Sequence, residues 1–485
     1  MCDTIQHVVE FRENLHRTFA FRSDATMDLI DAIAGNTSAK SVVELSLSSL
    51  FPRQYSSLHD AVDNFLVPGN PGKAKEERHT QQQIRMRLVA AQIPEPVQRN
   101  FFLVGLDTTG QPRPFAKTLT DRGIQYHPNP APGNKPIVVG HSYSVLAALP
   151  EKKGRTSPPW VIPLLIQRVS TDEKATNVGA AQVKDLLEDK TLPFGSKLCA
   201  VVADTSYSAR EFLGQAVKHT NLAAIVRVRA NRTFYRIPEQ DGSPKGKGHP
   251  TWYGVSFDMK DPTTWGEADA TELVPLTLRN GRVCQVQIQA WYDLLMLGKR
   301  DIPMHKHPFT VILIRVKDTH GEEVFKHPLW LIIIGERRQE ITLRDAYGAY
   351  RQRYDLEHFF RFGKHKLLMA SYQTPDAEHE QNWWEIVGLS YALLYVEAPL
   401  AHNIFRPWER YLPQAKEPKS ENLPSPSMVQ RTLPPIIRQI GTPASFPKPR
   451  GKSPGRAKGY SPGKRERLPV IIKGKKSDQI HTRSP

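Results

Sequence analysis

The chain has 485 residues, enough for about two to four domains at a typical domain size, and a hydrophobic fraction of 39% predicts that most of it folds. Lys and Arg number 66 against 49 Asp and Glu, so the net charge is +17. That excess favours a polyanionic partner, although charge kept only for solubility gives the same composition. Three cysteines without zinc-ligand spacing exclude a disulfide framework and fit a reducing compartment.

We expect a cytoplasmic protein without a membrane partner. No apolar run approaches the roughly 18–20 residues of a membrane span, and the N-terminus lacks the basic start and apolar middle of a signal peptide.

Residues 1–97 predict a helical domain. Segments 25–35, 40–51 and 56–67 place apolar residues at i, i+3 and i+4, and a further amphipathic stretch follows a break rich in Gly and Pro. Such a module can hold DNA, or it can serve only for packing or oligomerisation. The sequence leaves both alternatives open.

Residues 98–229 predict the first part of an α/β core. Strand-like runs end near 107, 149 and 170, a helix is expected over 171–189, and a strand ending at 204, a helix and another strand follow. The connection 108–134 carries several Pro and Gly and is expected to be a loop. This order predicts a mixed, partly parallel sheet flanked by helices.

Residues 230–328 predict a β-rich insertion, because turn signals separate short alternating runs. Trp252, Trp265 and Trp291 in this region can stack on an unpaired base, although core packing is the commoner use of tryptophan. Residues 329–412 predict the second part of the core, with a buried strand, one long helix over 341–369 and a further helical region.

The positive charge is concentrated at the C-terminus. Residues 416–485 contain 16 Lys and Arg against 4 Asp and Glu, a net charge of +12 that leaves +5 for the preceding 415 residues. This Pro-rich stretch has too little apolar surface to fold alone. We therefore predict a disordered basic tail over 413–485 that adds non-specific DNA affinity.

Two acids end buried strand-like runs, Asp107 in FLVGLDTTG and Asp204 in AVVADTSYS. Strand ends are where sheet-based sites are usually assembled. Either residue alone is also explained as a cap of the turn or helix that follows.

A polar stripe on the long predicted helix is more informative. Tyr350, Arg353, Glu357 and Lys364 are spaced by 3, 4 and 7 residues, so at about 100° per residue they share one helix face. Leu356, Phe359 and Phe360 lie beside them and are expected to pack on the sheet. The simpler interpretation is a solvated face with i,i+4 ion pairs, but that leaves the two upstream acids unexplained.

The pattern Y-x2-R-x3-E-x6-K resembles the Tyr-Arg-Glu-Lys signature of a branch of bacterial insertion-sequence DDE transposases. The resemblance covers about residues 100–370. It implies an RNase H-like catalytic core interrupted by a β-rich insertion, with Asp107, Asp204 and Glu357 as the catalytic acids. It further implies cut-and-paste transposition on double-stranded element ends and target DNA, by a homodimer associated with the bacterial nucleoid.

The chemistry of this reaction explains the residue types. Two Mg²⁺ or Mn²⁺ ions can activate the attacking oxygen and stabilise the leaving one, and hard cations prefer carboxylate ligands. We therefore expect Asp107, Asp204 and Glu357 to hold metal, and Tyr350, Arg353 and Lys364 to bind DNA phosphates. The alternatives are an inactive transposase-derived DNA-binding protein and an RNase H-like nuclease that does not transpose.

Overall fold

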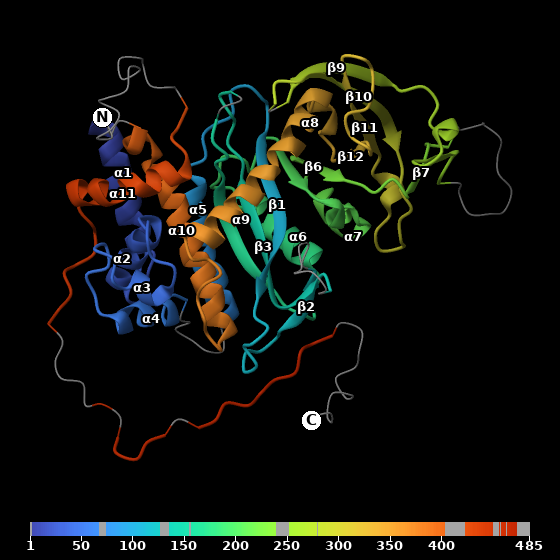
Figure 1. The fold of residues 1–485 in the computed structure, drawn as a ribbon. Coiled ribbons are helices and arrows are strands. Elements are labelled where there is room, and N and C mark those ends of the chain that lie inside the picture. Colours follow the sequence, from blue (N-terminus) through green and yellow to red (C-terminus); the bar gives the residue numbers. More distant parts are fainter. Residues whose placement is uncertain are drawn as a thin grey trace.

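A computed structural model describes residues 2–66, 74–126, 135–154, 157–238, 252–278, 280–402, 422–449, 455, 457–461 and 463–472. One large mixed sheet lies beside a body of helices, and the C-terminal chain runs from that body back to the sheet (Figure 1). None of the helices in the described part has both the length and the apolarity needed to cross a bilayer.

The N-terminal region is helical, as its apolar spacing predicts. Its elements are α1 (Cys2–Arg17), α2 (Ser23–Ala34), α3 (Val42–Leu45), α4 (Tyr55–Asp63) and α5 (Ala74–Ala90). The expected helix over 40–51 is reduced to the single turn α3, which Ser41 caps by accepting a hydrogen bond from the Glu44 amide.

The centre of the sheet is built from five strands in the order β4-β3-β1-β5-β6. These are β1 (Phe102–Pro112), β3 (Ile137–Ala148), β4 (Ile162–Val169), β5 (Cys199–Ala203) and β6 (Leu222–Arg227). β3 is antiparallel to β1 and β4, whereas β5 is parallel to β1 and β6. The helices that follow β4 and β5 are α6 (Ala175–Glu188) and α7 (Arg210–Ala216), the second preceded by the short helix η2 (Thr205–Ser208). This mixed α/β arrangement is compatible with the expected RNase H-like core.

The segment 108–134 is not a simple loop, contrary to expectation. β1 continues five residues past Asp107 because its outer half pairs with β3 as far as Pro112, and β2 (Gly123–Tyr126) also pairs with β3. Local Pro and Gly content did not indicate this, because the pairing partner lies beyond the segment. Residues 127–134 lie outside the described part.

The region 230–328 is rich in strands, but it continues the central sheet. Its elements are β7 (Thr233–Tyr235), β8 (Ser256–Asp258), η3 (Pro262–Thr264), β9 (Ala270–Thr277), β10 (Val283–Leu294), η4 (Met304–Lys306) and β11 (Phe309–Asp318). β12 (Leu329–Ile334) joins β11 to β6 by antiparallel pairing on both sides. The sheet therefore runs through β6-β12-β11-β10-β9, which extends the core instead of adding a separate unit.

The long helix expected over 341–369 is two helices, α8 (Leu343–Gln352) and α9 (Tyr354–Lys366), after the short helix η5 (Arg338–Glu340). They meet at Arg353, whose amide lies within hydrogen-bond distance of the carbonyls of both Ala349 and Tyr350. Sharing one donor between the i−3 and i−4 carbonyls tightens the turn there. The bend therefore falls inside the polar stripe.

The prediction of a wholly disordered tail is wrong for its first part. After α10 (Ala377–His402), helix α11 (Pro426–Ile440) packs on α10 and α2. Its buried positions Val429, Leu433, Ile436 and Ile437 follow helical spacing. α11 folds because neighbouring helices cover its apolar face, which the composition of the tail alone does not indicate.

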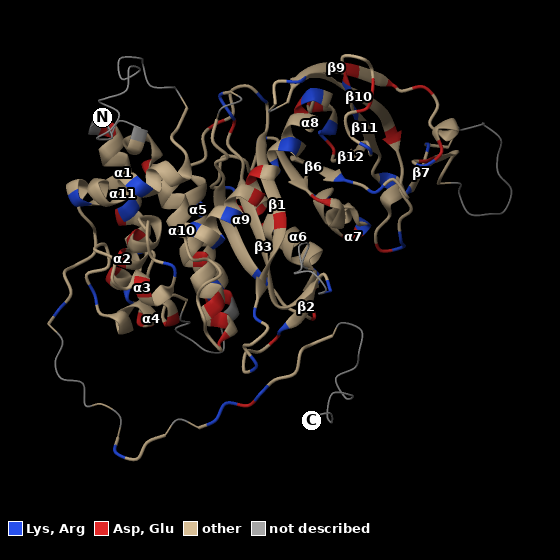
Figure 2. Ribbon diagram, in the orientation of Figure 1, with Lys and Arg blue, Asp and Glu red and all other residues tan. Residues whose placement is uncertain are grey.

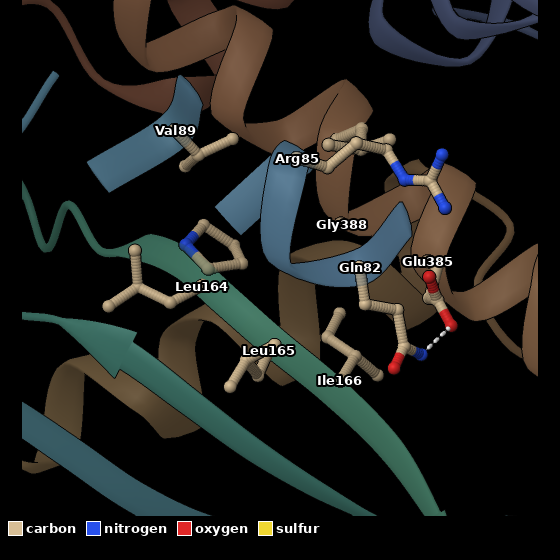
Figure 3. A pocket seen from close by; sticks show the side chains of 10 residues that line it. Gln82, Arg85, Val89, Leu164, Leu165, Ile166, Glu385 and Gly388 are labelled. Atoms are coloured by element: carbon tan, nitrogen blue, oxygen red, sulfur yellow. Dashed lines mark hydrogen bonds between the residues drawn. The ribbon is translucent and has the colours of Figure 1, made fainter. Parts of the chain in front are cut away.

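α10 joins the helical body to the sheet. It packs on α1, α2, α4, α11 and β4, and a buried ion-pair cluster links its Glu397 to Arg12 of α1, which also binds Asp31 of α2 at 2.7 Å. α5 packs on β4 beside α10, around a pocket where Gln82 donates to Glu385 (Figure 3). The pocket volume is about 40 Å³, the size of a water molecule and too small for a nucleotide.

Gly105 sets how closely α9 approaches the central strand. A Cβ atom at this position would lie 2.8 Å from Leu356 Cδ1 and 3.2 Å from Leu149 Cδ1. Leu356, Phe359 and Phe360 are buried, as the sequence predicts. The missing side chain therefore lets α9 lie directly on β1, two residues from Asp107.

We predict that Gly105→Ala destabilises the protein by about 1–3 kcal/mol, the usual cost of overpacking, because Leu356 has to move. Chemical denaturation measures the change. Gly348→Ala in α8 is the matched control, since a Cβ atom there meets nothing within 4 Å, and it should be neutral or slightly stabilising. Equal stability of both variants and the wild type would show that the close approach is unimportant.

Candidate active site

Asp107 and Asp204 lie at the same level of two neighbouring strands. β1 and β5 are parallel with Leu106 opposite Ala203, and each acid is the next residue along the chain. Neighbouring strands are about 4.8 Å apart, so the two acids lie at adjacent points. Asp107 lies in the middle of β1, whereas Asp204 directly follows β5.

The environment of Asp107 is largely closed. Its side chain is 15% exposed, Arg353 Nη1 lies 2.6 Å from Oδ2, and the Thr108 amide donates to Oδ1 at 2.8 Å. Burial raises the pKa of Asp107 to about 6, opposed by Arg353 and reinforced by the negative charges of Asp204 and Glu357. The three acids are therefore close enough to influence one another.

Arg353 connects the central strand to Glu357. Its guanidinium binds Asp107 through Nη1 and Glu357 Oε1 through Nη2, the latter at 3.3 Å. Burial alone would lower the pKa of Arg353, but these carboxylates raise it overall. Glu357 is 42% exposed, so its carboxylate remains accessible from solvent. The i,i+4 pair expected on a solvated face exists here, and Arg353 also binds Asp107, a half-buried acid on β1.

Asp204 also has a local structural role. Its Oδ1 accepts hydrogen bonds from the Ser206 amide at 2.9 Å and the Ser206 hydroxyl at 2.6 Å, and it caps η2. The capping alternative therefore describes Asp204 but not Asp107, which lies inside a strand. The second carboxylate oxygen of Asp204 has no recorded partner in the described part of the chain.

Tyr350 and Lys364 complete the predicted set. The Arg353 guanidinium carbon lies 5.7 Å from the centre of the Tyr350 ring. Lys364 Nζ donates to Thr109 Oγ1 at 2.7 Å and to the Gly110 carbonyl at 2.8 Å. Burial lowers the pKa of Lys364 to about 8. In this structure Lys364 thus holds α9 on the outer half of β1.

The carboxylates supply the oxygen ligands that Mg²⁺ or Mn²⁺ prefers. Within the described residues, no group of three His, Cys, Asp or Glu side chains is close enough to hold a metal ion. The Arg353 guanidinium lies where Asp107 and Glu357 attract positive charge. These carboxylates therefore suit a bound cation. In this structure the cation between Asp107 and Glu357 is the Arg353 guanidinium.

Arginines that the sequence analysis did not select surround the acids. Arg229, Asn231 and Arg232 line a cavity of about 680 Å³ together with Asp204. A second cavity, of about 530 Å³, is lined by residues that include Arg227, Arg315, Arg351, Arg353, Tyr347 and Tyr350. The run RVRANR after β5 and its helix is the signal that points to the first group.

The three tryptophans mainly pack. Trp291 is buried and Trp265 is partly buried, and both contact Phe257 and Trp330. Trp252 is 42% exposed and stacks on His305 with ring centres 4.2 Å apart. Base stacking remains a prediction only for Trp252.

The comparisons with known proteins give a family. No curated protein matches the chain. A family model described as a DDE superfamily endonuclease matches residues 10–296, a region that contains Asp107 and Asp204 and ends before Glu357. Because this match covers more than half of the sequence, the chain belongs to the DDE superfamily endonucleases.

Proposed function

We propose that this endonuclease is a DNA transposase of the Tyr-Arg-Glu-Lys branch, which cleaves the ends of a mobile element and joins them to target DNA. One observation carries the proposal. Asp107 on β1 lies next to Asp204, which follows the parallel strand β5, and Arg353 ties Asp107 to Glu357 on the helix packed over them. This arrangement supports a site to which three elements each contribute one acid, beside a residue suited to phosphate.

Asp107, Asp204 and Glu357 would hold one or two Mg²⁺ or Mn²⁺ ions. Such ions, when bound, activate the attacking oxygen and stabilise the leaving oxygen of the phosphodiester. The charges favour their entry, since three ionised carboxylates and one guanidinium sum to −2. Asp107, with a pKa of about 6, is mainly ionised at neutral pH.

Arg353 is proposed to exchange partners when DNA arrives. A phosphate offers the guanidinium the same bidentate geometry as a carboxylate. Once Arg353 binds the phosphate, Asp107 and Glu357 lose their side-chain cation and become available to metal. Tyr350, beside Arg353, is placed to donate a hydrogen bond to a neighbouring phosphate.

The substrate is proposed to be double-stranded DNA, both element ends and target. Arg227 and Arg229 are exposed at the end of β6, and Arg229 lines a cavity together with Asp204. Burial, and then the positive charges of Arg229 and Arg210, lower the pKa of Arg232. Such a like-charge cluster is stabilised by a polyanion. The homodimer and the bacterial nucleoid location follow from the resemblance alone and are part of the proposal.

The first prediction for this function concerns the helix stripe. Glu357→Ala should abolish Mg²⁺-dependent cleavage of a supercoiled plasmid carrying element ends, while DNA binding stays intact. Arg353→Ala should weaken binding of the cleavable end about 10- to 100-fold, as expected for loss of charged hydrogen bonds. Lys364→Ala should weaken binding less, because a point-charge contact is easier to replace.

Gel shift and plasmid assays on the three variants measure these effects. Arg344→Ala in α8, whose side chain is exposed and pairs with Glu272, is the matched control and should behave like the wild type. Binding without cleavage by the wild type would instead indicate an inactive DNA-binding protein, and cleavage without joining would indicate a simple nuclease. Wild-type cleavage by all three stripe variants would remove the main support for a transposase.

The second prediction concerns the basic tail. Because α11 is folded, the deletion that tests it is residues 441–485, which contain 12 Lys and Arg and 2 Asp and Glu. This deletion should weaken DNA binding and flatten its dependence on salt, since each lost phosphate contact reduces the slope by about 0.9. A chain of the same length with Gln at those basic positions should behave like the deletion. An unchanged slope in both would refute a role in binding.

A further inference from the structure

The C-terminal segment returns to the catalytic half of the sheet. The Leu468 amide donates to the Lys117 carbonyl and the Ile471 amide to the Arg122 carbonyl, both at 2.8 Å. Ile471 also forms a parallel bridge with Gly123, the first residue of β2. Residues 468–472, named here the docking segment, therefore lie along the outer side of β2.

Arg122 anchors this segment from inside the protein. Its side chain is buried, and Nη2 donates to the Leu468 carbonyl at 3.0 Å. Nη1 reaches the carbonyls of Arg113 and Pro114, each at 3.3 Å. One guanidinium thus joins the end of β1 to the docking segment. The added segment also covers an edge strand, whose backbone groups otherwise lack partners.

The other end of the chain connecting to this segment is fixed to the helical body. Arg53 Nη2 donates to the Ser445 carbonyl at 2.6 Å, and the Ser445 amide donates to Asp24 Oδ1 at 3.1 Å. The tail therefore has two attachment points, one after α11 and one at β2. A segment held at both ends loses less conformational freedom on binding than a free tail.

The described residues just before the docking segment are basic and exposed. Lys464, Arg465 and Arg467 carry three positive charges beside Glu466, and Figure 2 shows blue segments along this part of the chain. No carboxylate in the described part forms an ion pair with any of the three. Lys117, also exposed, lies where Leu468 docks.

The docking segment lies beyond the C-terminal end of β1, where Arg122 joins it to the Arg113 carbonyl. Because β1 and β5 are parallel and β1 continues past Asp107 to Pro112, β1 runs from the level of Asp204 toward this segment. Lys364 contacts β1 on the way, at Thr109 and Gly110. Basic groups therefore continue from the acids along β1 to the docking segment.

We propose that the docking segment holds Lys464, Arg465 and Arg467, with Lys117, as a phosphate-binding surface for the part of the DNA duplex that extends past the C-terminal end of β1. The proposal rests on the proposed function for its substrate, double-stranded DNA. It differs from simple attraction by a charged tail, because it requires the tail to be attached at β2.

Two proline variants test whether attachment of the docking segment at β2 matters independently of the charge of the tail. Ile471→Pro removes the amide that donates to Arg122 and changes no charge. Ile472→Pro is the matched control, since the Ile472 amide donates no hydrogen bond to any residue in the described part of the chain. Trypsin should cut after Arg467 about 3- to 10-fold faster in Ile471→Pro than in Ile472→Pro, which is the effect expected for losing one hydrogen bond.

DNA affinity is then measured on a short duplex with Ca²⁺, so that no cleavage is required. Ile471→Pro should bind more weakly than Ile472→Pro. Replacing Lys464, Arg465 and Arg467 together with Gln should reduce the salt slope by up to about 2.7, the value for three phosphate contacts. Equal cutting and equal affinity of the two proline variants would overturn the docking proposal while leaving the endonuclease function standing. Absence of DNA binding by the wild type would overturn both.

Discussion

The ion pairs of Arg353 with Asp107 and Glu357 are the interaction around which the candidate site is organised. They join the central strand to the helix that crosses it, and they hold the mostly buried carboxylate of Asp107 near the more exposed carboxylate of Glu357. Burial raises the pKa of Asp107, and the positive charge of Arg353 opposes that rise.

The rest of the fold brings Arg353 and the acids to the same part of the sheet. Gly105 lets Leu356 lie on β1, which brings Arg353 to Asp107. The parallel pairing of β1 and β5 brings Asp204 to the same edge. Beyond β6, the strands from β12 to β9 extend the sheet, so Arg315 of β11 and Tyr350 of α8 line the same cavity. The β-rich region 230–328 thus contributes to the wall of a cavity that Arg353 also lines.

The sequence predicted the features that depend on local periodicity. The apolar spacing of Leu356, Phe359 and Phe360 marked the buried face of α9. Two apolar runs located β1 and β5, with Asp204 directly after its strand as predicted, but Asp107 lies inside β1 and does not end it. Features that depend on distant partners were missed. Helix α11 was not predicted for two reasons. Pro434 and Pro435 normally break helices, and the helices that cover its apolar face, α2 and α10, are not its neighbours in the local sequence. The bend at Arg353 was not predicted, because neither Gly nor Pro lies at this position.

We propose that Asp107, Asp204 and Glu357 bind divalent metal once DNA engages Arg353. Calorimetric titration of Mn²⁺ into the protein bound to a short duplex tests this most directly. The wild type should bind Mn²⁺, and Asp107→Asn, Asp204→Asn and Glu357→Gln should each lose binding while still holding the duplex. Mn²⁺ binding that is the same in the wild type and all three variants would contradict the claim.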